Sequence, residues 1–141
     1  LAISHLVTAY VKNYTGRLSA VCGCGVAAST GATAAIAWLM SGDIKKVEGA
    51  IEHIVASLSG MICDGAKPGC ALKIATSVNA AALAAQLALN GTGATKRDGI
   101  VTDDLEETLR NLGKLGNEGM SEANDEILKM LLDKKTTKMC G

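Results

Sequence analysis

The sequence predicts an all-α domain of about five or six helices, and three observations lead to this class. Apolar residues recur at helical spacing along most of the chain, no segment alternates with period two for long enough to form a strand, and no internal repeat is evident. The 141 residues fit one domain with a sizeable core. Aromatic residues make up only 2% of the chain and Phe is absent, so small and aliphatic side chains must fill that core.

The first half of the chain predicts three helices. The opening segment forms an amphipathic helix that ends near Gly16. A second, mostly buried helix is expected from Leu18 to Met40, with its glycines as points where it can break. Asp43 is placed to cap a third helix, which Gly60 ends. The apolar face of this third helix is marked by Ile44, Val47, Ile51, Ile54, Val55 and Leu58.

The second half begins with a loop and continues with helices. Met61 to Gly69 holds two glycines and the only proline, which indicates a structured loop. The Ala-rich run from Cys70 to Asn90 is a strong helix former, and Asn90-Gly91 is suited to end it. A polar loop is then expected up to Gly99.

The remainder of the chain predicts two more helices. Asp103-Asp104-Leu105-Glu106 resembles a capping box that opens a helix through Leu112. A last helix should span about Glu122 to Leu132. The polar tail from Asp133 to Gly141 is expected to be frayed.

Charge and hydropathy exclude some partners. Fourteen basic and fourteen acidic side chains cancel, and no basic stripe with interleaved aromatics occurs, so no nucleic acid partner is expected. No membrane association is expected either, because Val26 to Met40 is shorter than the roughly 20 apolar residues that a bilayer requires, and Ala71 to Leu89 contains polar residues. The start of the chain lacks the features of a signal peptide. A cytoplasmic location is therefore expected.

Five cysteines without a secretory signal argue against a disulfide framework. Metal binding or catalysis is one interpretation, and the other is that a free Cys simply packs as a small apolar residue. Zinc usually draws on closely spaced Cys pairs or on His. His5 and His53 stand alone in helical segments, where surface or packing roles are expected.

The informative constellation is CGCG at Cys22 to Gly25, followed by GMICDGAKPGC from Gly60 to Cys70. A Gly-flanked turn and a Gly/Pro loop can bring three cysteines to one place, which suits an iron–sulfur cluster. Three thiolates on a cubane cluster would leave one iron open to act as a Lewis acid on a hydroxyl or thiol leaving group.

Neighbouring side chains suit this chemistry. Lys67 and Lys73 could offset the charge of a cluster or of a substrate carboxylate, although each could equally be a solvated charge. Asp64 could orient the loop or accept a proton, or it could form only a local turn hydrogen bond. A helix that starts near Gly69 would direct its free N–H groups to the same place.

At these residues the chain resembles a known family. The stretches AISHLVTAYVKNYTGRLSAVCGCGVAASTGATAAI, GMICDGAKPGCALKIATSV, DGIVTDDLEETLRNLGKLGNEGM and NDEIL closely resemble the C-terminal part of the uncharacterised bacterial family UPF0597. That family is related to L-cysteine desulfidase and to the α domain of iron–sulfur L-serine dehydratases. The resemblance covers nearly the whole chain, and GMICDGAKPGC is its most specific part.

The resemblance implies a helical domain with a [4Fe–4S] cluster, at whose free iron L-cysteine or L-serine loses sulfide or water by α,β-elimination. The implied ligands are Cys63, Cys70 and one Cys of CGCG, with Cys24 favoured and Cys22 as the alternative. The implied catalytic residues are Lys67 and Asp64.

The same resemblance bears on partners. Family members are about three times longer, and their N-terminal part carries a Cys-Thr-Glu-Pro stretch that this chain lacks, so this part is the expected partner and the chain alone should be nearly inactive. A homodimer is a second candidate. The competing interpretation is a noncatalytic helical module that uses its cysteines for a cluster, for redox sensing or for packing. Cys140 could in principle cap the open iron, but a surface thiol without a role is the expectation.

Overall fold

The computed structural model describes residues 1–94 and 98–137, with side chains up to Lys134. In this part of the chain it contains six α-helices and two short π-helical turns, and no β pairing beyond an isolated bridge between Val21 and Ile62. The all-α prediction is confirmed. The elements are α1 (Ala2–Thr15), the π turn η1 (Gly23–Ala27), α2 (Ala28–Ser41), α3 (Ile44–Leu58), α4 (Cys70–Leu89), α5 (Leu105–Lys114), the π turn η2 (Leu115–Gly119) and α6 (Ser121–Thr137).

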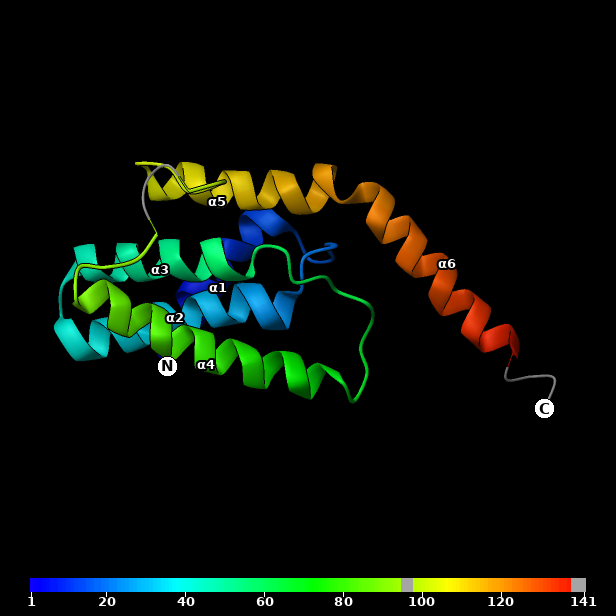
Figure 1. Ribbon diagram of the computed structural model, residues 1–141, viewed down its shortest axis with the longest axis horizontal. Coiled ribbons are helices and arrows are strands. Elements are labelled where there is room, and N and C mark those ends of the chain that lie inside the picture. The colour runs from blue at the N-terminus through cyan, green and yellow to red at the C-terminus, as the bar shows by residue number, and fades with distance from the viewer. Residues whose placement is uncertain (95–97, 138–141) are drawn as a thin grey trace.

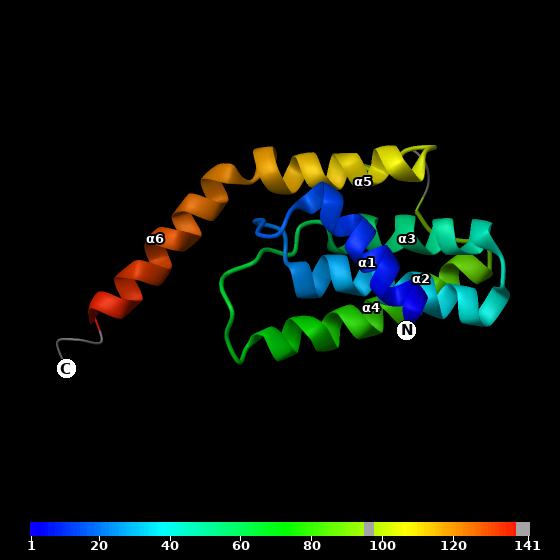
Figure 2. The same cartoon turned by 180° about the vertical axis from the view of Figure 1, so that it is seen from behind.

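Helix α2 lies at the centre of the bundle, where it packs against α1, α3 and α4 (Figure 1). Figure 2 shows α1 running diagonally across the bundle, with α5 along its upper edge, and α6 leads away from the body. The core is built mainly of Ala, Val, Ile and Leu, as the composition requires. Its largest fully buried apolar side chains are Ile54, Leu109, Leu112, Val11, Val26 and Val55.

Small residues let α1 and α2 approach closely. A Cβ on Gly31 would overlap the backbone carbonyl oxygen of Ser4 and the hydroxyl of Thr8, so no larger side chain fits at this crossing. Buried hydroxyls of α2 are satisfied within the helix, since Thr30 Oγ1 donates to the Val26 carbonyl at 2.8 Å and Thr33 Oγ1 to the Ser29 carbonyl at 2.8 Å. The hydroxyl groups of Thr30 and Thr33 therefore keep a hydrogen bond although they are buried at a close helix contact.

The predicted helix ends agree with the structure where caps were expected. Asp43 caps α3 by accepting from the Lys45 N–H at 2.9 Å, and Asp104 caps α5 by accepting from the Glu106 N–H at 2.8 Å. Helix α4 ends at Leu89, and Gly91 follows with a φ of +71°. The Asn90-Gly91 end of this helix is thus confirmed.

Two expected boundaries are wrong. The second helix does not begin at Leu18, because the segment up to Cys22 is held in extended pairing and the helical path starts only at Gly23. The last helix does not end at Leu132 but continues to Thr137, so the described part of the tail, residues 133–137, is helical where fraying was expected. Cys140 lies outside the described residues.

The membrane argument from length also needs correction. The continuous helical path Gly23–Ser41 has 19 residues and α4 has 20, and both are long and apolar enough to cross a membrane by length and composition alone. Such a test is also passed by core helices of soluble proteins. About half of the first segment is buried inside the bundle, whereas only 28% of the second is buried. Most of α4 is therefore exposed, unlike the first segment.

His53 is a buried packing residue on α3 that fixes the turn after α4. Its Nδ1 accepts from the Ala94 N–H at 3.1 Å, so Nε2 carries the proton and donates to the Thr92 carbonyl at 2.6 Å. Gly93, with a φ of +141°, lies against the ring so closely that a Cβ would overlap it. The packing role expected for this histidine is confirmed, whereas His5 is exposed on α1.

A phenol and carboxylate pair links α1 to α5. The Tyr10 hydroxyl donates to Glu106 Oε1 at 2.5 Å, and Arg110 pairs with the other oxygen of Glu106 at 2.8 Å. The hydrogen bond to Glu106 raises the pKa of Tyr10 above its usual range. The same hydrogen bond and the Arg110 charge lower the pKa of Glu106.

Replacing Gly31 by Ala should destabilise the fold. Ala gains about 1 kcal/mol of helix propensity over Gly, but overpacking costs about 1–3 kcal/mol, and here the clash is with backbone that cannot rotate away. We expect a net loss of about 1 kcal/mol in the free energy of unfolding, measured by urea denaturation. Gly60→Ala is the matched control, since no atom lies within 4 Å of its Cβ position. Equal midpoints for the two variants would contradict this packing.

The stabilisation provided by the Tyr10–Glu106 pair should depend on pH. Because the pKa of Glu106 is lowered in the folded protein, its contribution is complete above the pKa of the unfolded chain and is lost as the pH falls through the lower, folded pKa. Tyr10→Phe should therefore lower the melting temperature near pH 7, and this effect should shrink progressively as the pH is lowered through the acidic range. In a Glu106→Gln background the effect of Tyr10→Phe should no longer change over this range.

Candidate thiol site

The two cysteine segments are joined by backbone hydrogen bonds on either side of the Val21–Ile62 bridge. The Cys22 N–H donates to the Met61 carbonyl at 2.8 Å, and the Cys63 N–H donates to the Ala20 carbonyl at 2.7 Å. This antiparallel pairing connects the turn before α2 with the loop before α4. The prediction that the Met61–Gly69 loop lies beside CGCG is confirmed.

The same pairing sets which thiols share a side. Side chains that flank a bridged pair point away from the face used by the pair itself, so Cys22 and Cys63 lie on the same face of the bridge. Both cysteines contribute to the packing of the hydrophobic core. Cys22 is 4% exposed, whereas Cys63 is only partly buried.

Cys22 and Cys24 have different surroundings, because Cys22 precedes the π turn η1 and Cys24 lies within it. Cys22 Sγ accepts from the Gly25 N–H at 3.3 Å and so caps the helix that follows, while Cys24 is exposed. Gly25 permits a close approach, because a Cβ there would overlap Met61 Sδ. The Gly25 carbonyl accepts from Ser77 Oγ at 2.7 Å, which anchors CGCG to α4.

Asp64 is the centre of a small ion cluster. Its two carboxylate oxygens pair separately with Lys67 and with Lys73, and Lys73 Nζ also donates to the Ile62 carbonyl at 2.7 Å. The Asp64 side chain keeps 29% of its surface exposed. Asp64 thus orients both ammonium groups around the loop.

Cys70 begins α4, but the start of this helix does not offer free donors. Its Sγ donates to the Gly65 carbonyl at 3.6 Å. The N–H groups of Cys70, Ala71 and Leu72 bond to carbonyls three residues earlier, at 2.9 to 3.1 Å. The expectation of free N–H groups near Gly69 is wrong for these three residues, because a tight first turn satisfies them.

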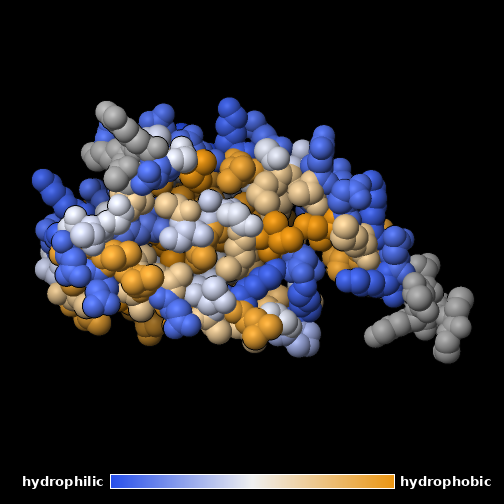
Figure 3. All heavy atoms as spheres, viewed as in Figure 1, coloured by the Kyte–Doolittle hydropathy of each residue, from blue (hydrophilic) through white to orange (hydrophobic). Residues whose placement is uncertain are grey.

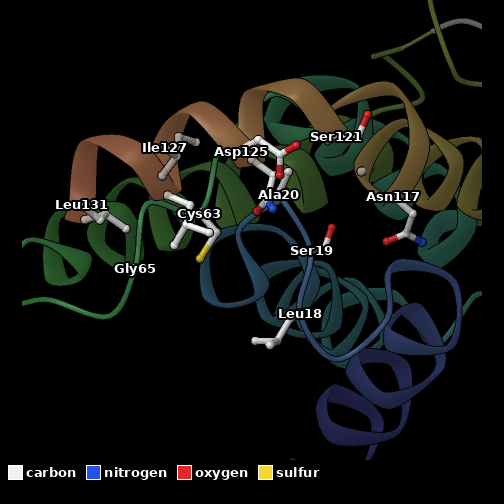
Figure 4. A pocket seen from close by; sticks show the side chains of 13 residues that line it. Leu18, Ser19, Ala20, Cys63, Gly65, Asn117, Ser121, Asp125, Ile127 and Leu131 are labelled. Carbon is white, nitrogen blue, oxygen red and sulfur yellow. The ribbon is translucent and has the colours of Figure 1, made fainter. Parts of the chain in front are cut away.

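Helix α6 lies along one side of the loop and lines an open cavity of about 380 Å³ to which Cys63 also contributes. In Figure 4, Cys63 lies below Ile127 and beside Leu131 of α6, and Asp125 is turned toward Ala20. Leu131 also lies 3.4 Å from the Cβ position of Gly65, whose φ of +88° requires glycine here. The polar lining comes from Ser19, Asn117, Ser121, Asn124 and Asp125.

These cavity residues and Lys12 were not anticipated from the sequence. Lys12 Nζ donates to the Arg17 carbonyl at 3.2 Å and lies 3.6 Å from the Cβ position of Gly23, so it places a cation beside CGCG. Lys12 sits on the polar face of α1 by helical spacing, which gives no sign of this contact. Only the pairing of distant segments shows it.

Among the residues that the structure describes, no three His, Cys, Asp or Glu side chains gather as they would around a single metal ion. The donor set is nevertheless of one chemical kind, since the described cysteines are all free thiols on two adjoining segments. Thiols of this kind suit iron–sulfur clusters, which bind each thiolate at a separate iron. The donor chemistry therefore fits a cluster and not a single-ion site.

This arrangement defines a small helical domain whose thiol-rich site is assembled from two loops that are far apart in sequence and adjacent in space. Comparison with known proteins places it: the chain matches the serine dehydratase alpha chain family over residues 1–129 and belongs to that family. No solved structure shows a significant match.

Curated relatives show the same affiliation. The chain is 57% identical over 133 residues to a UPF0597 protein of Clostridioides difficile, covering 94% of this chain and 31% of the relative. It is 56% identical over 131 residues to a UPF0597 protein of Alkaliphilus oremlandii, covering 93% and 30%. The resemblance predicted from the motifs is confirmed, and the chain spans about 30% of the length of these relatives, in their C-terminal part.

The thiols should differ in reactivity. Alkylation requires access to the sulfur, so Cys24 should react with iodoacetamide in the folded protein at least about tenfold faster than Cys22. The rates can be compared by peptide mass spectrometry after short exposures. In urea the two rates should become similar. Faster labelling of Cys22 in the native protein would contradict the burial of its side chain.

Proposed function

We propose that this chain is the [4Fe–4S]-binding domain of an amino-acid α,β-eliminating lyase, which converts L-cysteine and water to pyruvate, ammonia and sulfide, or L-serine to pyruvate and ammonia. The observation that carries the proposal is the backbone pairing of CGCG with the CDGAKPGC loop, in a chain of the serine dehydratase alpha chain family. The pairing supports a shared site for cysteines that are about forty positions apart in the sequence.

The proposed ligands are Cys24, Cys63 and Cys70. Cys22 is the less suitable third ligand, because its thiol is buried in the close-packed core and already accepts the Gly25 N–H. An inorganic core with four irons needs open space, which the exposed Cys24 has. When bound, the cluster would supply a Lewis acid through an iron that lacks a protein ligand.

The ion cluster has two proposed tasks. Lys67 and Lys73 bind the α-carboxylate of the substrate, and Asp64 holds these ammonium groups in position between turnovers. Asp64 is also the proposed proton acceptor on this loop, which it can become when a substrate carboxylate takes its place beside one lysine. Both substrates carry this carboxylate, so the choice between L-cysteine and L-serine depends on the β-substituent.

The noncatalytic alternative has its own supporting observation. Cys22 serves in packing the hydrophobic core. A module that used its cysteines only in this way would be expected to bury its apolar helix faces. Several large apolar side chains are instead well exposed on α4, which favours a domain of a larger enzyme.

Anaerobic reconstitution with iron and sulfide tests the cluster. We expect visible absorption near 400 nm and, after reduction, a paramagnetic resonance signal in the chain and in the full-length protein. Cys63→Ser, Cys70→Ser and Cys24→Ser should each remove most of the signal, whereas Cys22→Ser and Cys140→Ser should keep it. Loss of the signal in the Cys22→Ser variant but not in the Cys24→Ser variant would identify Cys22, in place of Cys24, as the third ligand. Full-length protein that remains active after complete iron removal would refute the lyase mechanism.

A further inference from the structure

Helix α4 carries its larger apolar side chains on the wrong side for a helix at the surface of a complete protein. Its buried face consists only of small residues, which are Ser77, Ala81, Ala84, Ala85 and Ala88. The exposed half of the helix holds Leu72 at 75%, Val78 and Leu83 at 58% each, and the polar residues Asn79 and Gln86, whereas helical spacing places Ile74, at 47%, on the side of the buried residues. A surface helix normally directs such residues inward.

The exposed face of α4 is also uncharged. The only charged residue in this 20-residue helix is Lys73, which is held by Asp64 and the Ile62 carbonyl. In Figure 3, orange and tan apolar groups lie along the lower band that α4 occupies in Figure 1, interrupted by pale and blue polar residues. An apolar face of this kind, without charges to solvate it, is typical of a protein interface.

We propose that this face, defined as Leu72, Val78 and Leu83, is the docking surface for the polypeptide that precedes the matched segment in full-length family members. The relatives contain more than twice as much chain outside the matched segment as within it. A body covering α4 would also reach Cys70 and Lys73, and so would complete one wall of the thiol site. Sites between two such bodies are common in enzymes.

The structure favours this occupant over a lipid surface. Membrane-surface helices carry Lys and Arg beside their apolar face, and α4 has no free cation to place there. It also favours a tethered partner over a second copy, because a covalently linked segment acts at a high effective concentration. The proposal rests on family membership and not on lyase chemistry.

Hydroxyl-radical labelling with mass spectrometry tests the docking without requiring activity or a cluster. In the 141-residue chain, Leu72, Val78 and Leu83 should be labelled readily. In the full-length protein that carries the chain, their labelling should fall by about fivefold or more. Leu39 on α2, which is 87% exposed, is the control. Undiminished labelling of the α4 residues, or an equal decrease at Leu39, would overturn the proposal.

Matched variants provide a second measurement. Val78→Glu and Leu39→Glu should each change the melting temperature of the 141-residue chain by about 2 °C or less, because both side chains are exposed. In the full-length protein Val78→Glu should lower it by several degrees more than Leu39→Glu. Concentration-dependent dimers of the chain that Val78→Glu abolishes would overturn the proposal in favour of a second copy. Flotation with phosphatidylglycerol vesicles that the same change abolishes would overturn it in favour of lipid.

Discussion

The two backbone hydrogen bonds around Val21 and Ile62 determine where every cysteine of the site lies. They hold the segment before α2 in an extended path, so the helix starts later than its apolar sequence would allow. They also fix the loop before α4 against the core through Met61. Because Ser77 ties α4 to the Gly25 carbonyl, the same pairing sets the position of the exposed α4 face relative to the thiols.

Small side chains make this arrangement sterically feasible. Gly25 admits Met61, Gly31 admits α1, and Ala residues line the inner face of α4. A core with almost no aromatic side chains gains stability from many close backbone approaches instead of from a few large groups. Such a core tolerates added volume poorly, since the neighbouring atoms are often main chain.

Much of the fold could be predicted from periodicity and capping chemistry, because both act within a few residues. Asp43, Asp104 and Gly91 stand where the sequence places them. The start of the second helix could not be predicted, since a long-range pairing overrides local helix propensity there. The polar composition of the tail predicts fraying, so it does not reveal that α6 extends to Thr137.

The candidate site, like the fold, could be predicted from the sequence only in part. The cysteine motifs identified both loops, and the resemblance they carried led to the correct family. Lys12 and the Asp125 side of the cavity were missed, because their contacts join segments that are distant in sequence and follow no spacing rule. The first-turn donors of α4 were misjudged, as a three-residue hydrogen-bond pattern cannot be seen in composition.

The turn after α4 has a defined protonation requirement. His53 receives one hydrogen bond and gives another, and this is available only to the neutral ring with its proton on Nε2. An imidazolium has no lone pair to offer the Ala94 N–H, and two N–H groups would then face each other across 3.1 Å. The turn formed by residues 90–94 is therefore held by both nitrogens of one imidazole ring, one as acceptor and the other as donor.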